Sequence, residues 1–80
     1  MSWYLRAAEQ GDAEAQSSLG LMYANGRGVP HDYVSAYMWF NLAAAKGDQI
    51  AKRNRDKVAG KMTQAQIEEG QRLALEWKPK

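Results

Sequence analysis

Apolar residues recur along this chain at the spacing of an α-helix, and no segment alternates between apolar and polar residues as a half-buried strand does. Ala15, Leu19, Met22 and Tyr23 stand at i, i+4, i+7 and i+8, so they share one helical face. A second and longer stripe consists of Tyr33, Ala36, Tyr37, Phe40, Ala43 and Ala44. The pattern predicts an all-α protein with helices near residues 3–10, 13–25, 33–46, 48–60 and 64–77.

Two Gly-Asp pairs mark predicted helix boundaries. In both Gly11-Asp12 and Gly47-Asp48, the glycine suits the end of one helix, where φ is often positive, and the aspartate suits the N-cap of the next. We therefore expect successive helices with almost no linker between them.

The segment between residues 25 and 33 has the composition of a turn. Gly26 and Gly28 permit positive φ, and Pro30 forces Val29 into an extended conformation. Asp32 then suits the N-cap of the following helix. The two flanking helices are therefore expected to form an antiparallel pair.

The last predicted helix has the clearest start signal. Thr63 and Gln66 form a T-x-x-Q capping box, and Met62 is placed to contact Ile67 as a hydrophobic staple. The apolar face of this helix consists of Ile67, Gly70, Leu73, Ala74 and Trp77. We expect the helix to pack on the rest of the protein through that face.

The sequence contains an internal repeat with a period of 36 residues. Residues 3–15 and 39–51 agree at six of 13 positions, where composition alone predicts about one. The identical pairs are Trp3 and Trp39, Ala7 and Ala43, Ala8 and Ala44, Gly11 and Gly47, Asp12 and Asp48, and Ala15 and Ala51. Such a period is typical of stacked helix pairs.

The repeated unit carries A-x-x-x-L-G-x-x-Y, then G-x-G-V, then D-x-x-x-A-x-x-W-x-x-x-A-A. The residues that supply these motifs are Ala15, Leu19, Gly20, Tyr23, Gly26, Gly28, Val29, Asp32, Ala36, Trp39, Ala43 and Ala44. This set resembles the Sel1-like repeat, a relative of the tetratricopeptide repeat. The resemblance implies a right-handed superhelix of αα-hairpins, whose first helices line a concave surface used to scaffold protein complexes.

We expect one Sel1-like repeat domain over residues 1–80. Its parts are a partial unit (1–10), a full repeat (11–46), and a degenerate repeat with a C-terminal capping helix (47–80). In the degenerate unit, Arg55 and Asp56 stand where the full repeat has Leu19 and Gly20. Such drift suits an end repeat, which needs a polar outer face.

The partial unit begins in the middle of a second helix, at Trp3 and Tyr4. We expect this aromatic face to lack its usual cover. The sequence therefore predicts self-association through the N-terminal edge at high concentration.

Composition narrows the chemistry that the chain supports. The absence of cysteine excludes disulfides and thiolate metal sites, and no apolar run approaches the ~20 residues that span a membrane. The net charge of +2 favours no class of partner, and no targeting signal assigns a compartment. We expect no metal, no cofactor and no membrane span.

His31 is the only histidine, and it precedes Asp32, as a general base oriented by a carboxylate would. The alternative is a solvated turn residue. We favour it because no cysteine or positioned serine follows, and because Asp32 is expected to cap a helix. The sequence therefore predicts no catalytic residue and no enzyme activity.

Six of the eleven basic residues fall between positions 46 and 61. They are Lys46, Lys52, Arg53, Arg55, Lys57 and Lys61, and the last five form a candidate patch for nucleic acid or another acidic surface. The simpler interpretation is the solvated face of a capping helix, because no aromatic residue is interleaved to stack bases. Salt separates these options, since binding to nucleic acid weakens steeply with salt and binding of a peptide in a groove does not.

Aromatic residues at helical spacing are predicted to form the core and not a ligand cage. They are Trp3, Tyr23, Tyr33, Tyr37, Trp39, Phe40 and Trp77.

The face of the 13–25 helix opposite Leu19 and Tyr23 remains for binding. Its candidate contacts are Glu14, Ser17, Ser18, Leu21 and Asn25. Leu21 is the preferred anchor, because an apolar side chain among small polar ones is the type that interfaces use. The sequence thus predicts a noncatalytic scaffold or adaptor that binds a protein or peptide on its helical face.

Overall fold

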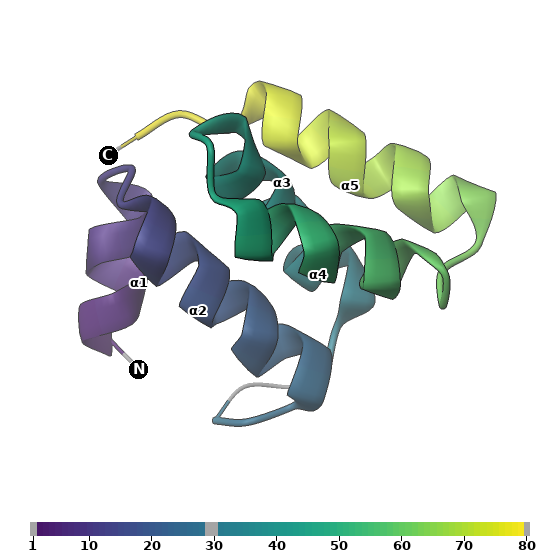
Figure 1. The fold of residues 1–80 in the computed structure, drawn as a ribbon, viewed down its shortest axis with the longest axis horizontal. Coiled ribbons are helices and arrows are strands. Elements are labelled where there is room, and N and C mark those ends of the chain that lie inside the picture. Colours follow the sequence, from purple (N-terminus) through teal and green to yellow (C-terminus); the bar gives the residue numbers. More distant parts are fainter. Residues whose placement is uncertain (1, 29–30, 80) are drawn as a thin grey trace.

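The computed structural model describes residues 2–28 and 31–79 of the chain (Figure 1). Over these residues it contains no strand and five helices: α1 (Ser2–Glu9), α2 (Ala13–Asn25), α3 (Tyr33–Ala45), α4 (Gln49–Ala59) and α5 (Gln64–Glu76). Each bound lies within one residue of its prediction, which confirms the all-α fold. The predicted extended conformation of Val29 before Pro30 lies outside the described residues.

The central helix of the molecule is α3, which packs against α2, α4 and α5. Helix α1 packs on α2, and α2 also contacts α4. In Figure 1, α2 and α3 form a helix pair, α4 and α5 both lie against α3, and α1 lies beside α2. This arrangement is that of an αα-hairpin repeat of the tetratricopeptide type.

The two Gly-Asp pairs end and begin helices as predicted. Gly11 and Gly47 have φ of 99° and 96°, conformations that favour glycine. The Asp12 carboxylate accepts a hydrogen bond from the backbone N–H of Ala15 at 3.0 Å. Asp48 does the same at the start of α4, from Ala51 at 2.9 Å. The internal repeat therefore reproduces a local structure as well as a sequence.

The capping box at the start of α5 is also confirmed. The backbone N–H of Gln66 donates to the Thr63 hydroxyl at 3.1 Å, and the backbone N–H of Thr63 donates to Oε1 of Gln66 at 2.9 Å. Met62 and Ile67, the predicted staple, are both partly buried against the core around α3. The first turn of α5 is therefore anchored by hydrogen bonds and by packing.

The core is built on both sides of α3. Tyr37 and Phe40 lie in one buried cluster, and Trp39 lies with Leu19 in the other. The Trp39 ring meets the Trp77 ring edge to face, with centroids 6.1 Å apart, so the C-terminal end of α5 closes the second cluster. Tyr23, Tyr33 and Trp77 are partly buried against these clusters, as predicted.

Trp3 is the exception among the aromatic residues predicted to be core. It is 71% exposed, and its neighbour Tyr4 is 38% exposed. The two rings contact each other edge to face with centroids 5.4 Å apart. Helix α1 packs on α2, and both rings stay exposed to solvent among the described residues. The core prediction is wrong for Trp3, and the expected uncovered aromatic face is present.

Gly20 allows α2 and α3 to approach closely. A Cβ at this position would lie 2.5 Å from two ring atoms of Phe40, a residue with no exposed surface. Gly70 plays the equivalent role on α5, where a Cβ would lie 2.7 Å from the Tyr37 ring. The helix spacing therefore depends on the absence of side chains at two positions.

We predict that Gly20→Ala lowers the free energy of unfolding by about 1–2 kcal/mol, because the new Cβ would overlap the buried Phe40 ring and force it out of its packed position. The overlap itself costs about 1–3 kcal/mol, which outweighs the roughly 0.5–1 kcal/mol that alanine gains over glycine in a helix. Gly60→Ala is the matched control, since the backbone there is right-handed and the nearest atom to a new Cβ is 3.4 Å away. Urea denaturation measures both, and a Gly20→Ala protein as stable as the parent would contradict the account.

Candidate functional site

A pocket of about 210 Å³ lies where α2 and α4 face each other. Its lining residues are Leu21, Ala24, Asn25, Tyr33, Phe40, Asn54, Lys57, Val58 and Lys61. Helices α2 and α4 supply the walls, α3 supplies Tyr33 and Phe40, and Lys61 follows the end of α4. We call this feature the α2/α4 groove.

The floor of the α2/α4 groove is apolar. Phe40 has no exposed surface and Val58 is 6% exposed, whereas Leu21 is 43% exposed. Leu21 stands two residues from the fully buried Leu19, which turns it by roughly 200° around α2. Burial of Leu19 in the core therefore directs Leu21 away from the core and toward the groove.

Polar groups without protein partners surround this apolar part. Among the described residues, the side-chain amides of Asn25 and Asn54 accept and donate no hydrogen bond within the protein, and Lys57 and Lys61 form no ion pair. Every described lining residue is neutral or basic. The groove therefore combines an apolar surface with a positive edge.

The paired charges of α5 contrast with these lysines. Arg72 donates to Glu69 at 2.7 Å and to Glu76 at 2.9 Å. The hydrogen bond and charge of Glu69, followed by those of Glu76, raise the pKa of Arg72. The positive charge of Arg72 is thus neutralised locally, whereas the charges of Lys57 and Lys61 remain available to a ligand.

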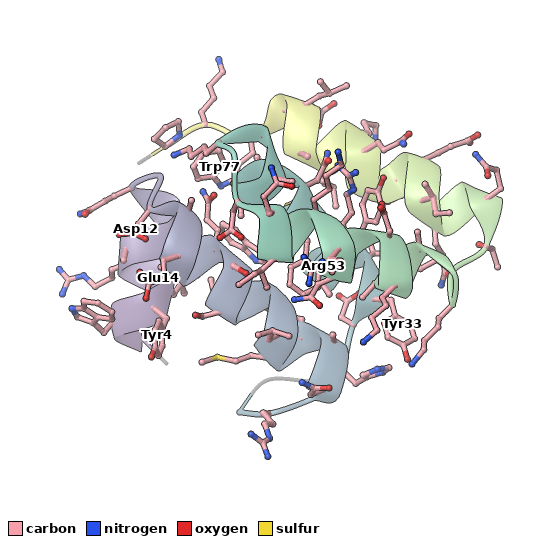
Figure 2. The ribbon with its side chains drawn as sticks, in the orientation of Figure 1. Tyr4, Asp12, Glu14, Tyr33, Arg53 and Trp77 are labelled. Atoms are coloured by element: carbon pink, nitrogen blue, oxygen red, sulfur yellow. The ribbon has the colours of Figure 1, made fainter. Side chains whose placement is uncertain are left out.

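The structure separates the five candidate contacts predicted on α2. Leu21 and Asn25 line the groove. Glu14 lies at the other end of α2, in a shallow hollow of about 100 Å³ beside Trp3, Tyr4 and Asp12. Figure 2 shows Tyr4, Asp12 and Glu14 together at this end.

Ser17 and Ser18 do not line the groove. Ser17 is only 8% exposed, which leaves little of its surface for a partner to contact. The physical reason is that α1, α3 and α4 all pack against α2 and leave little of its circumference open. Ser18 is half-buried and lines neither hollow.

The five basic candidate residues also differ in whether they line the groove. Lys57 and Lys61 line the groove, whereas Lys52 and Arg53 are exposed on α4 outside its lining (Figure 2 labels Arg53). Arg55 points to α3, where Nη1 donates to Oδ1 of Asn41 at 3.1 Å. Its Nε also contacts the Asp56 carboxylate at 3.3 Å, so its charge is paired.

Tyr33, Asn54 and Lys57 are groove residues that were not assigned to a peptide surface from the sequence. The 36-residue repeat contains the missing signal. It relates Leu21 to Lys57 and Asn25 to Lys61, and both members of each pair line the groove. Applying the repeat to the candidate surface therefore identifies its second wall.

His31 and Asp32 lie in the turn before α3. His31 is exposed, and its ring meets that of Tyr33 edge to face at 4.4 Å. The Asp32 carboxylate accepts from the backbone N–H groups of Val34 and Ser35 and, at 2.8 Å, from the Ser35 hydroxyl. These hydrogen bonds give Asp32 the predicted role of N-cap.

The described part of the chain contains no group of three or more His, Cys, Asp or Glu side chains placed to hold a metal ion. Within the same residues, no helix combines the length and apolar character needed to cross a membrane.

Comparison with known proteins identifies related sequences. The family model for the Sel1 repeat matches residues 1–12 and 13–48, which confirms the resemblance seen in the motifs. Chitin synthase regulator SKT5 of Malassezia restricta is 38% identical over 58 residues, or 72% of this chain. The protein of the same name from Saccharomyces cerevisiae is 39% identical over 57 residues, or 68% of this chain. The chain spans only 4% and 8% of the lengths of these two relatives.

We predict that Leu21→Ala lowers the free energy of unfolding by about 1 kcal/mol or less, because Leu21 is partly solvated already. Leu19→Ala is the matched control, and it should cost about 2–5 kcal/mol because Leu19 has no exposed surface. Chemical denaturation compares the two. Equal losses would show that Leu21 serves the fold and would remove it as a binding residue.

Proposed function

The chain belongs to the Sel1 repeat family, and from this premise we propose that it is a noncatalytic adaptor that binds a protein or peptide in the α2/α4 groove. Sel1 repeats generally mediate protein–protein interaction. The observation that carries the proposal is a partly exposed Leu21 above the buried Phe40 and Val58, in a groove with unpartnered polar groups at its edge. Interfaces commonly centre on an apolar contact that polar groups surround.

The size of the groove also favours a peptide side chain. Pockets for small-molecule ligands and cofactors generally enclose about 300–1,000 Å³, and this one is about 210 Å³. Such a volume suits one apolar side chain of a partner whose remaining contacts lie along α2 and α4. We infer a modest affinity, because one such pocket provides only one anchor.

The names of the relatives support an adaptor role. Both are called regulators of chitin synthase, which describes action through another protein. We propose a regulatory adaptor role of this general kind, with the α2/α4 groove as the surface that contacts the partner.

Selection of random 12-residue peptides on the full chain tests the proposal. We predict that recovered peptides perturb the backbone NMR signals of Leu21, Ala24 and Asn54, and that Leu21→Asp weakens their binding about tenfold or more. Leu75→Asp is the matched control, because Leu75 is 87% exposed on α5 outside the groove lining. This variant should bind within about twofold of the parent.

Two results would contradict the proposal. In the first, the selection recovers no peptide, or the recovered peptides perturb the NMR signals of another face. The other is binding of an oligonucleotide through the basic segment with a steep loss of affinity on adding salt, which would favour the alternative function.

We also propose that a second copy of the chain covers Trp3 and Tyr4 at high concentration. Their equivalents in the repeat, Trp39 and Phe40, are only 6% and 0% exposed. The same repeat positions are thus buried in the full repeat and exposed in the partial unit. When a second copy of the chain packs on this surface, part of the apolar area is buried and no other protein is required.

For this self-association, sedimentation equilibrium should show dimers at millimolar concentration. The double variant Trp3→Ala with Tyr4→Ala should shift the protein toward monomer, because it removes both exposed rings. Leu75→Ala, which removes an exposed apolar side chain elsewhere, is the control. A strict monomer at millimolar concentration would rule out the proposal.

A further inference from the structure

We propose that the α2/α4 groove selects acidic peptides, in which an apolar anchor side chain stands within one or two residues of a carboxylate. This inference rests on the proposed function and names the chemistry of the partner. We propose a peptide as the ligand because the groove offers one apolar cavity and a separate positive edge.

The cavity provides the site for the anchor. Leu21, Ala24 and Val58 contribute aliphatic surface, and the rings of Tyr33 and Phe40 contribute aromatic surface. An aliphatic or aromatic side chain that enters this space replaces water around a partly exposed leucine. A charged side chain in the same place would lose hydration without gaining a partner, so the anchor must be apolar.

The positive edge provides the site for the carboxylate. Lys57 and Lys61 stand four positions apart at the end of α4, and neither has an ion-pair partner in the described part of the chain. Arg53, four positions before Lys57, adds a third exposed positive charge on the same helix. Arg53 and Lys57, four positions apart on α4, repel each other, so a bound carboxylate both pairs with a lysine and reduces that repulsion.

The nearest acidic side chain in the sequence does not neutralise this edge. Asp56 precedes Lys57, but its carboxylate contacts Arg55, whose guanidinium points toward Asn41 on α3. The amide groups of Asn25 and Asn54 provide further donors and acceptors for the peptide backbone. The groove thus presents several donors and no competing carboxylate among its described lining residues.

The spacing between anchor and carboxylate follows from the small size of the site. Leu21 and Lys57 line the same cavity of about 210 Å³. An extended peptide advances roughly 3.3–3.6 Å per residue. One or two residues therefore carry the peptide from the cavity to its lysine edge.

The peptide selection on the full chain tests this inference. We expect the recovered peptides to share an apolar residue with Asp or Glu one or two positions away. Synthetic peptides in which this acid is replaced by its amide should bind about five- to tenfold more weakly. The same loss is expected when the parent peptide is measured against the double variant Lys57→Glu with Lys61→Glu.

The matched control for charge is Arg6→Glu with Lys78→Glu, which makes the same change in net charge at exposed positions outside the groove. Its affinity should stay within about twofold of the parent. Circular dichroism establishes that both double variants fold. Selection repeated on the Lys57→Glu, Lys61→Glu protein should recover Lys or Arg in place of the acid.

The outcomes separate this inference from the function on which it rests. Peptides that occupy the groove without an acidic preference, or that bind the Lys57→Glu, Lys61→Glu protein equally well, would overturn the inference and leave the adaptor function in place. Failure to recover any peptide that binds the groove would overturn both.

Discussion

The close contact of Gly20 with the ring of Phe40 constrains the rest of the structure. Phe40 has no exposed surface, and it is part of both the core around α3 and the lining of the α2/α4 groove. A side chain at position 20 would overlap this ring, so the missing Cβ sets the distance between α2 and α3. Because α4 also packs on α3, the same contact determines where the two walls of the groove stand.

Local signals were sufficient to predict the helices. Gly11-Asp12 and Gly47-Asp48 each combine a conformation that favours glycine with an N-cap, and both properties are fixed within a few residues of the chain. Thr63 and Gln66 define the start of α5 in the same local way.

The candidate site was predicted only in part, because burial depends on neighbours that are distant in sequence. Ser17 shares the polar pattern of Asn25 but is covered by packing around α2, and Arg55 belongs to the basic segment but points to Asn41. Gln16 is fully buried, with its amide donating to the carbonyl of Ala8, although nothing in the pattern marks it as core. The peptide surface and the basic segment, alternatives in the sequence, contribute opposite walls of one groove.

The central claim is that a peptide side chain occupies this groove, and intermolecular nuclear Overhauser effects measure that occupancy directly. With a selected peptide bound to the full chain, we predict contacts from its apolar anchor to the methyl groups of Leu21 and Val58 and to the Tyr33 ring. Contacts from its acidic residue should reach the side chains of Lys57 or Lys61. A bound peptide whose contacts fall only on α1, α5 or the Trp3 and Tyr4 face would contradict the account.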